Sequence, residues 1–215
     1  ARPRAATHGF AMVLQAAQAA GPAAGWPRGF PAAGTVLDAA RDAYDHAFVI
    51  FAMAWYYRAT GNAEALALAA DAHDFLQQYL ADPVHGGFFE EFPDTGKLPR
   101  RQNPHMHLLE AVLAMHEATQ QTAPDPRWLA QAHGLLTLFE EKFLDPASGS
   151  LIELFTGDWY PAEGAAGALR EPGHQFEWVW LLGQYVRLSG QQRLQPLVDG
   201  LFAFGSRFGI DRQDA

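Results

Sequence analysis

The amino-acid sequence predicts an all-α fold, an (α/α)6-type barrel (a helical toroid) that is incomplete in this chain. Two observations lead to this prediction. Helical segments occur in pairs that repeat about every 60–65 residues, and similar Gly-rich aromatic loops follow two of the pairs. In such a barrel the first helix of each pair lines the inside and the second packs outside. The loops before the inner helices would then gather at one mouth.

The loops show the clearest internal similarity. DPVHGGFFEEF (residues 82–92) aligns with DPASGSLIELF (residues 145–155), so that Glu90 corresponds to Glu153. The Asp-Pro pairs at the start of both loops predict the ends of the preceding helices, because a residue before proline disfavours the helical conformation.

The inner helices are predicted over residues 44–60, 105–119 and 173–189, where apolar residues follow a helical period. His46, His107 and His174 stand near their starts, and we interpret these three histidines as equivalent. THGFAMV, which contains His8, is a weaker fourth copy.

The outer helices are predicted over residues 63–80, 127–144 and about 191–207. TGNAEAL and SGQQRL separate inner from outer helices, because Gly ends a helix and a following polar residue begins the next one.

The repeat also predicts that the barrel is partial, with residues 1–215 forming a single domain. An outer helix is missing near residues 21–25, and six units of this period would need about 370 residues, with further helices after the last pair. A partial toroid leaves apolar helix faces uncovered. We therefore expect a fragment, or a protein with disordered or missing segments. A partner chain, as in a homodimer, could also cover the open edge. A helical solenoid of unrelated function is the alternative architecture.

Composition excludes several classes of function. The net charge of −9 without a basic cluster argues against a nucleic-acid partner, and the absence of cysteine excludes disulfides and thiolate chemistry. No apolar run is long enough to span a membrane. No signal peptide is visible, so a cytoplasmic location is expected.

The densest polar cluster is NPHMHLLE, residues 103–110. Asn103 and His107 are four residues apart and His107 and Glu110 three apart, so these side chains can share one side of the helix start. The structural alternative is a helix cap, in which Asn103 binds backbone amides.

A second candidate is EPGHQFEW, residues 171–178, in which His174 and Glu177 lie on one helix face. A carboxylate bonded to one ring nitrogen of a histidine fixes its tautomer and raises the basicity of the other nitrogen, which proton transfer needs. A capped helix start with a satisfied histidine is the alternative.

A zinc site made of His105, His107 and His174 is an alternative to proton transfer. Two histidines separated by one residue at a helix start point about 100° per residue apart, and no HExxH pattern exists, so no metal is expected. Aromatic residues near the loops, Trp178 among them, suit the faces of sugar rings.

The phrases RRQNPHMHLLEA, EPGHQFEW and AYDHAF resemble the N-acylglucosamine 2-epimerase family, which includes mannose isomerases and cellobiose 2-epimerases. The resemblance runs from about His8 to Asp211. It implies an (α/α)6 barrel that isomerises or 2-epimerises a monosaccharide or disaccharide without a cofactor. In that chemistry a histidine removes the proton next to the open-chain carbonyl, and a cis-enediolate forms.

Carried over by motif, the resemblance assigns His174 as a catalytic histidine and Glu177 as the carboxylate that orients it. It assigns His107 to ring opening or proton relay, and Asn103 and Tyr44 to substrate binding. Arg4 is the nearest match to an arginine that stabilises the enediolate, one residue out of register. The second catalytic histidine of the family falls beyond Ala215, so we expect an isomerase or epimerase that is inactive or severely impaired in the chain as given.

Two other functions remain open at this point. One is a sugar-binding module that keeps the fold without catalysis. The other is a glycoside hydrolase or lyase on the same toroid, which would need two carboxylates across a cleft, and Glu90 and Glu153 are the candidates.

Overall fold

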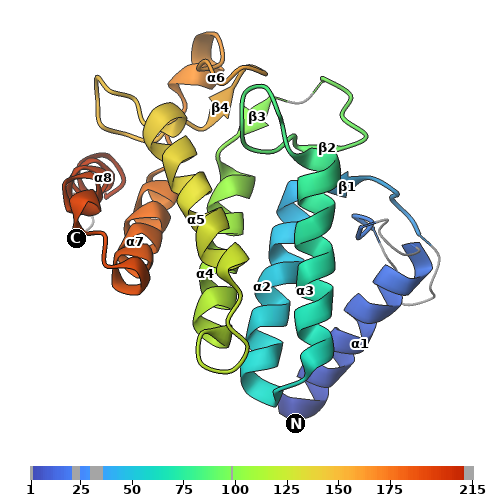
Figure 1. Cartoon of the computed structure of the whole chain (residues 1–215). Coiled ribbons are helices and arrows are strands. Elements are labelled where there is room, and N and C mark those ends of the chain that lie inside the picture. Colours follow the sequence, from blue (N-terminus) through green and yellow to red (C-terminus); the bar gives the residue numbers. More distant parts are fainter. Residues whose placement is uncertain (1, 21–24, 30–35, 98, 211–215) are drawn as a thin grey trace.

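The computed structural model of the chain describes residues 2–20, 25–29, 36–97 and 99–210. Helices make up most of it, and short strands join them at one end (Figure 1). The α-helices are α1 (Arg2–Ala20), α2 (Ala43–Thr60), α3 (Ala63–Phe75), α4 (Asn103–Thr119), α5 (Pro126–Leu138), α6 (Gly164–Ala168), α7 (Pro172–Ser189) and α8 (Gln195–Phe208). The strands are β1 (Arg41–Asp42), β2 (Glu91–Phe92), β3 (Arg100–Arg101) and β4 (Leu154–Phe155).

The helices form two rows, as the repeats predicted. α2, α4 and α7 make the inner row, in which α4 contacts both of the others. Each has its own outer partner: α3 packs on α2, α5 on α4 and α8 on α7 (Figure 1). α1 packs against α2. The paired arrangement confirms the predicted all-α architecture of helical hairpins.

Local sequence sets the helix boundaries. α2 begins after Asp42, whose side chain accepts a hydrogen bond from the backbone N–H of Asp45, and ends at Gly61 in the left-handed conformation. Asn62 then caps α3 through the N–H of Glu64. Gly190 ends α7 in the same left-handed way. The predicted stop-and-start segments between paired helices are therefore confirmed.

Two outer helices end in a π-helical turn, a second sign of the repeat. Residues Leu76–Leu80 follow α3 and Phe139–Phe143 follow α5. In both units an Asp-Pro pair then leaves the helix, and the Asp side chain accepts backbone N–H bonds from the turn that follows. A short 3-10 turn, Gln192–Leu194, precedes α8.

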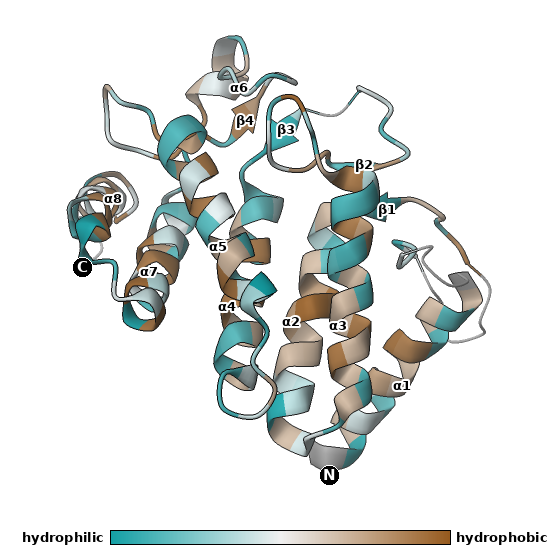
Figure 2. Ribbon diagram, viewed as in Figure 1, coloured by the Kyte–Doolittle hydropathy of each residue, from teal (hydrophilic) through white to brown (hydrophobic). Residues whose placement is uncertain are grey.

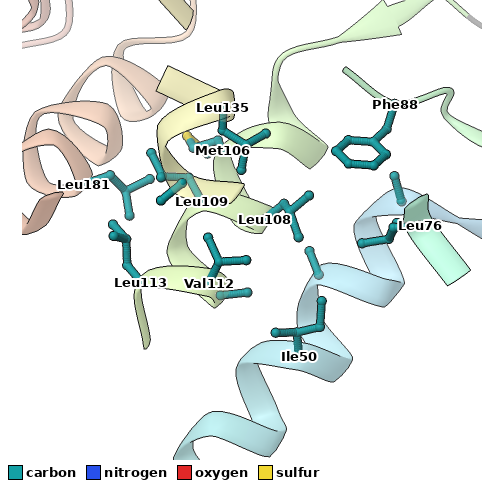
Figure 3. Close-up of a cluster of buried hydrophobic side chains, with 14 of the residues drawn as sticks. Ile50, Leu76, Phe88, Met106, Leu108, Leu109, Val112, Leu113, Leu135 and Leu181 are labelled. Atoms are coloured by element: carbon teal, nitrogen blue, oxygen red, sulfur yellow. The ribbon is translucent and has the colours of Figure 1, made fainter. Parts of the chain in front are cut away.

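The hydrophobic core lies between the two helix rows. Fully buried side chains of α2, α4 and α5 meet there, among them Ile50, Leu108, Leu109 and Leu135 (Figure 3). Figure 2 shows hydrophobic residues along α2 and α3, with hydrophilic residues at helix ends and in loops. Burial of these apolar side chains stabilises the hairpins against one another.

The strands gather at the end of the molecule where α2 and α4 begin (Figure 1). β1 pairs with β2, and β3 pairs with β4, in two separate antiparallel ribbons. In the second ribbon Arg100 lies opposite Phe155 and Arg101 opposite Leu154. This pairing brings the loop after α5 to the start of α4, where the candidate site lies.

The outer helix predicted to be missing near residues 21–25 falls largely outside the described residues. The described residues between α1 and α2 contain an isolated bridge of Gly29 with Asp38 and no helix. Within the described part of the chain, no helix is long and apolar enough to cross a membrane.

Candidate active site

His174 lies in the first turn of α7, directly after Pro172 and Gly173, and both of its ring nitrogens have partners. Nδ1 is 2.8 Å from Oε2 of Glu153. Nε2 is 3.1 Å from the side-chain amide nitrogen of Asn103, at the start of α4. Because a carboxylate only accepts hydrogen bonds, Nδ1 carries the proton and Nε2 accepts from Asn103.

The Glu153 contact makes His174 more basic. The hydrogen bond to Glu153 is the largest cause that raises the pKa of His174 above its usual value, and partial burial opposes it. A neutral ring with Nδ1–H directed at a carboxylate offers a basic lone pair at Nε2. This geometry suits a group that removes and returns a proton.

Glu153 was not among the residues expected in this role. Its side chain is 5% exposed, and its two oxygens also accept from the side chain of Gln102 and from the backbone N–H of Glu171. The repeat marked Glu153 only as the counterpart of Glu90, which binds the backbone and side chain of Arg101 in the preceding unit. The glutamates at one repeat position, Glu90 and Glu153, were the only indication in the sequence of a shared anchoring role.

Glu177 was expected to orient His174, and the structure corrects this expectation. The carboxylate that hydrogen-bonds His174 is Glu153, which lies 21 residues earlier in the sequence. Glu177 is exposed and contributes a smaller, charge-based increase to the pKa of His174. One turn separates the two residues on α7, but His174 points back toward the start of α4, where the loop ending in β4 meets it.

His107 forms a second polar group on the neighbouring helix. Its Nδ1 is 3.3 Å from Oε2 of Glu110, as the spacing predicted. The ring of Tyr44 meets His107 edge-on with 5.1 Å between ring centroids, and Phe48 lies 4.8 Å away. Tyr44 and His107 are thus neighbours across α2 and α4.

His107 and Glu177 line one small hollow of about 60 Å³, together with Glu110 and Trp180. The inner helices α4 and α7 therefore present acid–base side chains to a common space. A larger hollow of about 620 Å³ lies at the other ends of these helices, around His116, His133 and Tyr185, away from this group.

Asn103 does not act as the predicted helix cap. The N-cap position of α4 is Gln102, and it makes no side-chain capping bond. The amide of Asn103 instead contacts His174. Asn103 joins α4 to the catalytic candidate on α7.

The expected equivalence of His46, His107 and His174 is wrong. His46 and His105 are the matching pair: each ring places Nδ1 on the carbonyl four residues earlier, and Nε2 accepts a backbone N–H, from Trp26 and Phe88 respectively. Gln175 takes this position in the third unit, where its Oε1 accepts from Leu151 N–H. What repeats is a buried side chain that accepts a hydrogen bond from the backbone of the preceding loop. In the third unit this side chain is Gln175, and His174 is the residue before it.

Burial shows that these two histidines are structural. Burial lowers the pKa of His46 to about 4 and that of His105 to about 3, so both are neutral near pH 7. Within the described residues, no group of three or more His, Asp or Glu side chains is close enough to hold a metal ion.

Two residues expected to bind substrate lie elsewhere. The side chain of Trp178 is completely buried, stacked on Phe139 with 4.3 Å between ring centroids, so its ring cannot face a ligand. Arg4 lies in the first turn of α1, and Phe10, farther along α1, stacks on Tyr56 near the C-terminal end of α2. Arg4 is therefore at the end of the bundle away from the strands (Figure 1).

Known sequences include clear relatives of this chain. The sequence model of the family described as N-acylglucosamine 2-epimerase (GlcNAc 2-epimerase) matches residues 2–215. A mannose-6-phosphate isomerase of Rhizobium meliloti is 34% identical over 192 residues, covering 86% of this chain and 48% of the relative. A D-mannose isomerase of Marinomonas mediterranea is 29% identical over 184 residues, covering 79% of this chain and 45% of the relative.

Solved structures show the same likeness. The cellobiose 2-epimerase of Spirochaeta thermophila superposes with a TM-score of 0.77 at 26% identity, covering 90% of this chain and 51% of that one. The chain thus spans about half the length of the relatives it matches. These matches confirm the resemblance expected from the three sequence phrases.

Proposed function

The chain belongs to the N-acylglucosamine 2-epimerase family, and from this premise we propose that it contributes the proton-transfer half of a sugar isomerase or 2-epimerase site. The observation that carries the proposal is the His174 ring, held by Glu153 at Nδ1 with Nε2 directed at Asn103. A basic nitrogen fixed in one tautomer at the start of an inner helix is what abstraction of a carbon-bound proton requires.

The proposed reaction begins with an open-chain aldose or ketose. Nε2 of His174 takes the proton from the carbon next to the carbonyl, and the electrons of the broken C–H bond form the enediolate, with negative charge on the former carbonyl oxygen. Transfer of the O2 proton to O1, followed by return of a proton to C1, completes an aldose–ketose isomerisation, and return of the proton to the opposite face of C2 completes an epimerisation. No electron leaves the sugar, so the reaction needs no redox cofactor.

The neighbouring residues take roles that follow from their positions. Glu153 stabilises the imidazolium that forms when His174 accepts the proton. Asn103 offers an amide N–H beside Nε2, where it can bind a substrate oxygen as the sugar takes its place next to the ring. His107, paired with Glu110 beside Tyr44, is placed to serve ring opening and to contact the sugar.

Glu177 keeps a place in the proposal as a substrate contact. It lines the same small hollow as His107 and remains exposed. Its charge adds to the basicity of His174 without a direct bond. The relatives named for mannose and cellobiose make these two sugars the first substrates to test.

The decisive experiment is hydrogen exchange at carbon. The intact protein is incubated in D2O with mannose, glucose, fructose, N-acetylmannosamine and cellobiose between pH 6 and 9, and deuterium at C1 and C2 is followed by NMR. Uptake in at least one sugar, lost in the His174→Asn variant, is the expected result. Full exchange in that variant would remove His174 from the mechanism.

The alternative, a sugar-binding module without catalysis, gives a different outcome in the same samples. Calorimetry would then show heat of binding for a sugar whose C2 proton never exchanges. Binding of the same sugar by His174→Asn with unchanged affinity would add that the histidine is no part of the contact surface.

A further inference from the structure

Gln102 lies between the proposed base and the hydrophobic core, and its side chain is completely buried. Its Oε1 accepts a hydrogen bond of 2.8 Å from the indole N–H of Trp178. Its Nε2 donates to Oε2 of Glu153 at 2.8 Å and lies 3.1 Å from Nδ1 of His174. The hydrogen-bond partners of this amide are therefore Trp178 and Glu153, since Nδ1 of His174 already carries a proton.

The chemistry of these partners fixes the orientation of the Gln102 amide. An indole N–H can only donate, so it must meet the oxygen of the amide. A carboxylate can only accept, so it must meet the NH2 group. A flipped amide would put two donors together at Trp178 and two acceptors together at Glu153, in a place where water cannot compensate.

The backbone holds this arrangement in register. The N–H of Gln102 donates to the carbonyl of Glu153 at 3.3 Å, as a continuation of the β3–β4 ribbon in which Arg101 lies opposite Leu154. Trp178 is in turn fixed by stacking on Phe139. The oxygen Oε2 of Glu153 thus receives two N–H groups, one from Gln102 and one from His174, which its lone pairs can accommodate.

We propose that Gln102 and Trp178 are positioning residues that hold Oε2 of Glu153 on Nδ1 of His174, so that the neutral ring keeps its proton on Nδ1 and its lone pair on Nε2. This inference rests on the proposed function for its catalytic meaning. The positioning itself is argued only from the hydrogen bonds that link Trp178, Gln102 and Glu153 to one another. Neither positioning residue touches the sugar in this arrangement.

The test reads the tautomer of His174 directly. ¹⁵N-histidine-labelled protein is compared by NMR for wild type, Gln102→Met and Trp178→Phe, each over a pH titration. Wild type is expected to show Nδ1–H in the neutral ring, and both variants an increased fraction of the Nε2–H form. The kcat of each variant should fall by about tenfold with little change in KM, a part of the roughly 100- to 10,000-fold that a positioned acid–base group contributes.

Matched controls separate positioning from general damage to the fold. Gln175→Met removes another completely buried glutamine, one residue from His174, whose Oε1 serves Leu151. Trp26→Phe removes another buried indole N–H, which donates to the carbonyl of Val13. Both controls should keep the wild-type tautomer of His174.

The outcomes are distinguishable. A wild-type tautomer in Gln102→Met, or an equal change in Gln175→Met, would overturn the positioning role even if the sugar reaction is real. The expected change of tautomer in a protein that never exchanges the C2 proton would leave this inference standing and remove the proposed function. If Gln102→Met fails to fold, Trp178→Phe decides by the same readout, because it keeps an aromatic ring against Phe139.

Discussion

The residue on which the site depends is His174, and its properties come from a partner distant in sequence. The motif EPGHQFEW predicted a role for His174 in the site. The same motif pointed to Glu177 as the partner, since spacing along a helix is all that a linear pattern can measure. The ring instead turns toward the loop that ends in β4, where Glu153 binds it.

The first prediction separates the two carboxylates. Replacing Glu153 with Gln removes the strongest cause that raises the pKa of His174, so that pKa should fall. The same change at Glu177, which is exposed and acts only through its charge, should lower it much less. Titration of the His174 ring by NMR measures both, and an equal or larger effect of Glu177→Gln would contradict the assignment.

The sign of the pH effect follows from the raised pKa. The folded chain holds the His174 proton more tightly than the unfolded chain, so this pair stabilises the fold fully below the unfolded pKa, and the stabilisation is lost as pH rises through the folded pKa. Catalysis by the neutral ring runs the opposite way: activity rises with pH through the folded pKa. In Glu153→Gln this rise should therefore move to lower pH while kcat falls.

At the scale of elements, the inner helices share a buried hydrogen-bond acceptor that could not be aligned from the sequence. Each inner helix presents a buried acceptor to the preceding loop, from His46, His105 and Gln175. Because the third copy uses a different amino acid, alignment of histidines alone matched the wrong positions. The register became visible only through the shared backbone partners.

The second prediction uses the natural variation among these elements. His105→Gln should retain an acceptor for the N–H of Phe88, as Gln175 does for Leu151, whereas His105→Leu leaves that buried N–H unsatisfied. We expect His105→Leu to lose about 1–3 kcal/mol of unfolding free energy and His105→Gln clearly less. Urea unfolding at pH 7 measures the difference, and equal losses would show that packing of the ring matters more than its bond.

The third prediction concerns the loop that carries the second ribbon. Arg100 binds Asp82 at 2.6 Å with both side chains nearly inaccessible, contacts the carbonyls of Gly86 and Phe88, and lies over the ring of Trp159. Arg100→Met should cost about 3–5 kcal/mol, because it strands a buried carboxylate.

The matched control for Arg100 is Arg187→Met, since the two side chains of the Arg187–Glu117 ion pair are 49% and 31% exposed. A surface-exposed ion pair contributes little to stability. Chemical denaturation of both variants should therefore show a much smaller loss for Arg187→Met. Comparable losses would mean that the Arg100–Asp82 pair is not the anchor of this loop.

At the scale of the whole molecule, the buried histidines make the fold sensitive to acid. His46 and His105 have folded pKa values of about 4 and about 3 because they are buried, so the unfolded chain binds more protons as pH falls below the ordinary histidine value near 6.5. Their contribution to stability is present above that value and lost as pH falls toward the folded values.

The fourth prediction puts a slope on this effect. Each histidine should reduce the unfolding free energy by up to about 1.4 kcal/mol per pH unit between roughly pH 6 and 4. Replacing both His46 and His105 with Gln should remove this part of the pH dependence while the carboxylates keep theirs. Denaturant unfolding at several pH values measures it, and an unchanged slope in the double variant would assign acid sensitivity to other groups.

The sequence by itself determined the helices, their pairing and the family. Apolar periodicity, Gly and Asp-Pro punctuation and the loop repeat are local or regularly spaced properties, and a linear chain displays them fully. It also predicted His174, Asn103 and His107 as site residues, because they stand in contiguous phrases.

Only the tertiary structure decided which groups act on His174. Glu153 and Gln102 lie against its ring from positions 21 and 72 residues away in the sequence, and Trp178 in turn binds Gln102 across 76 residues. It also removed Trp178 and Arg4 from the mouth, because burial and helix direction, not residue type, decide what a side chain can touch. Hydrogen bonding in a buried site depends on distances in space, and no spacing along the chain encodes those distances.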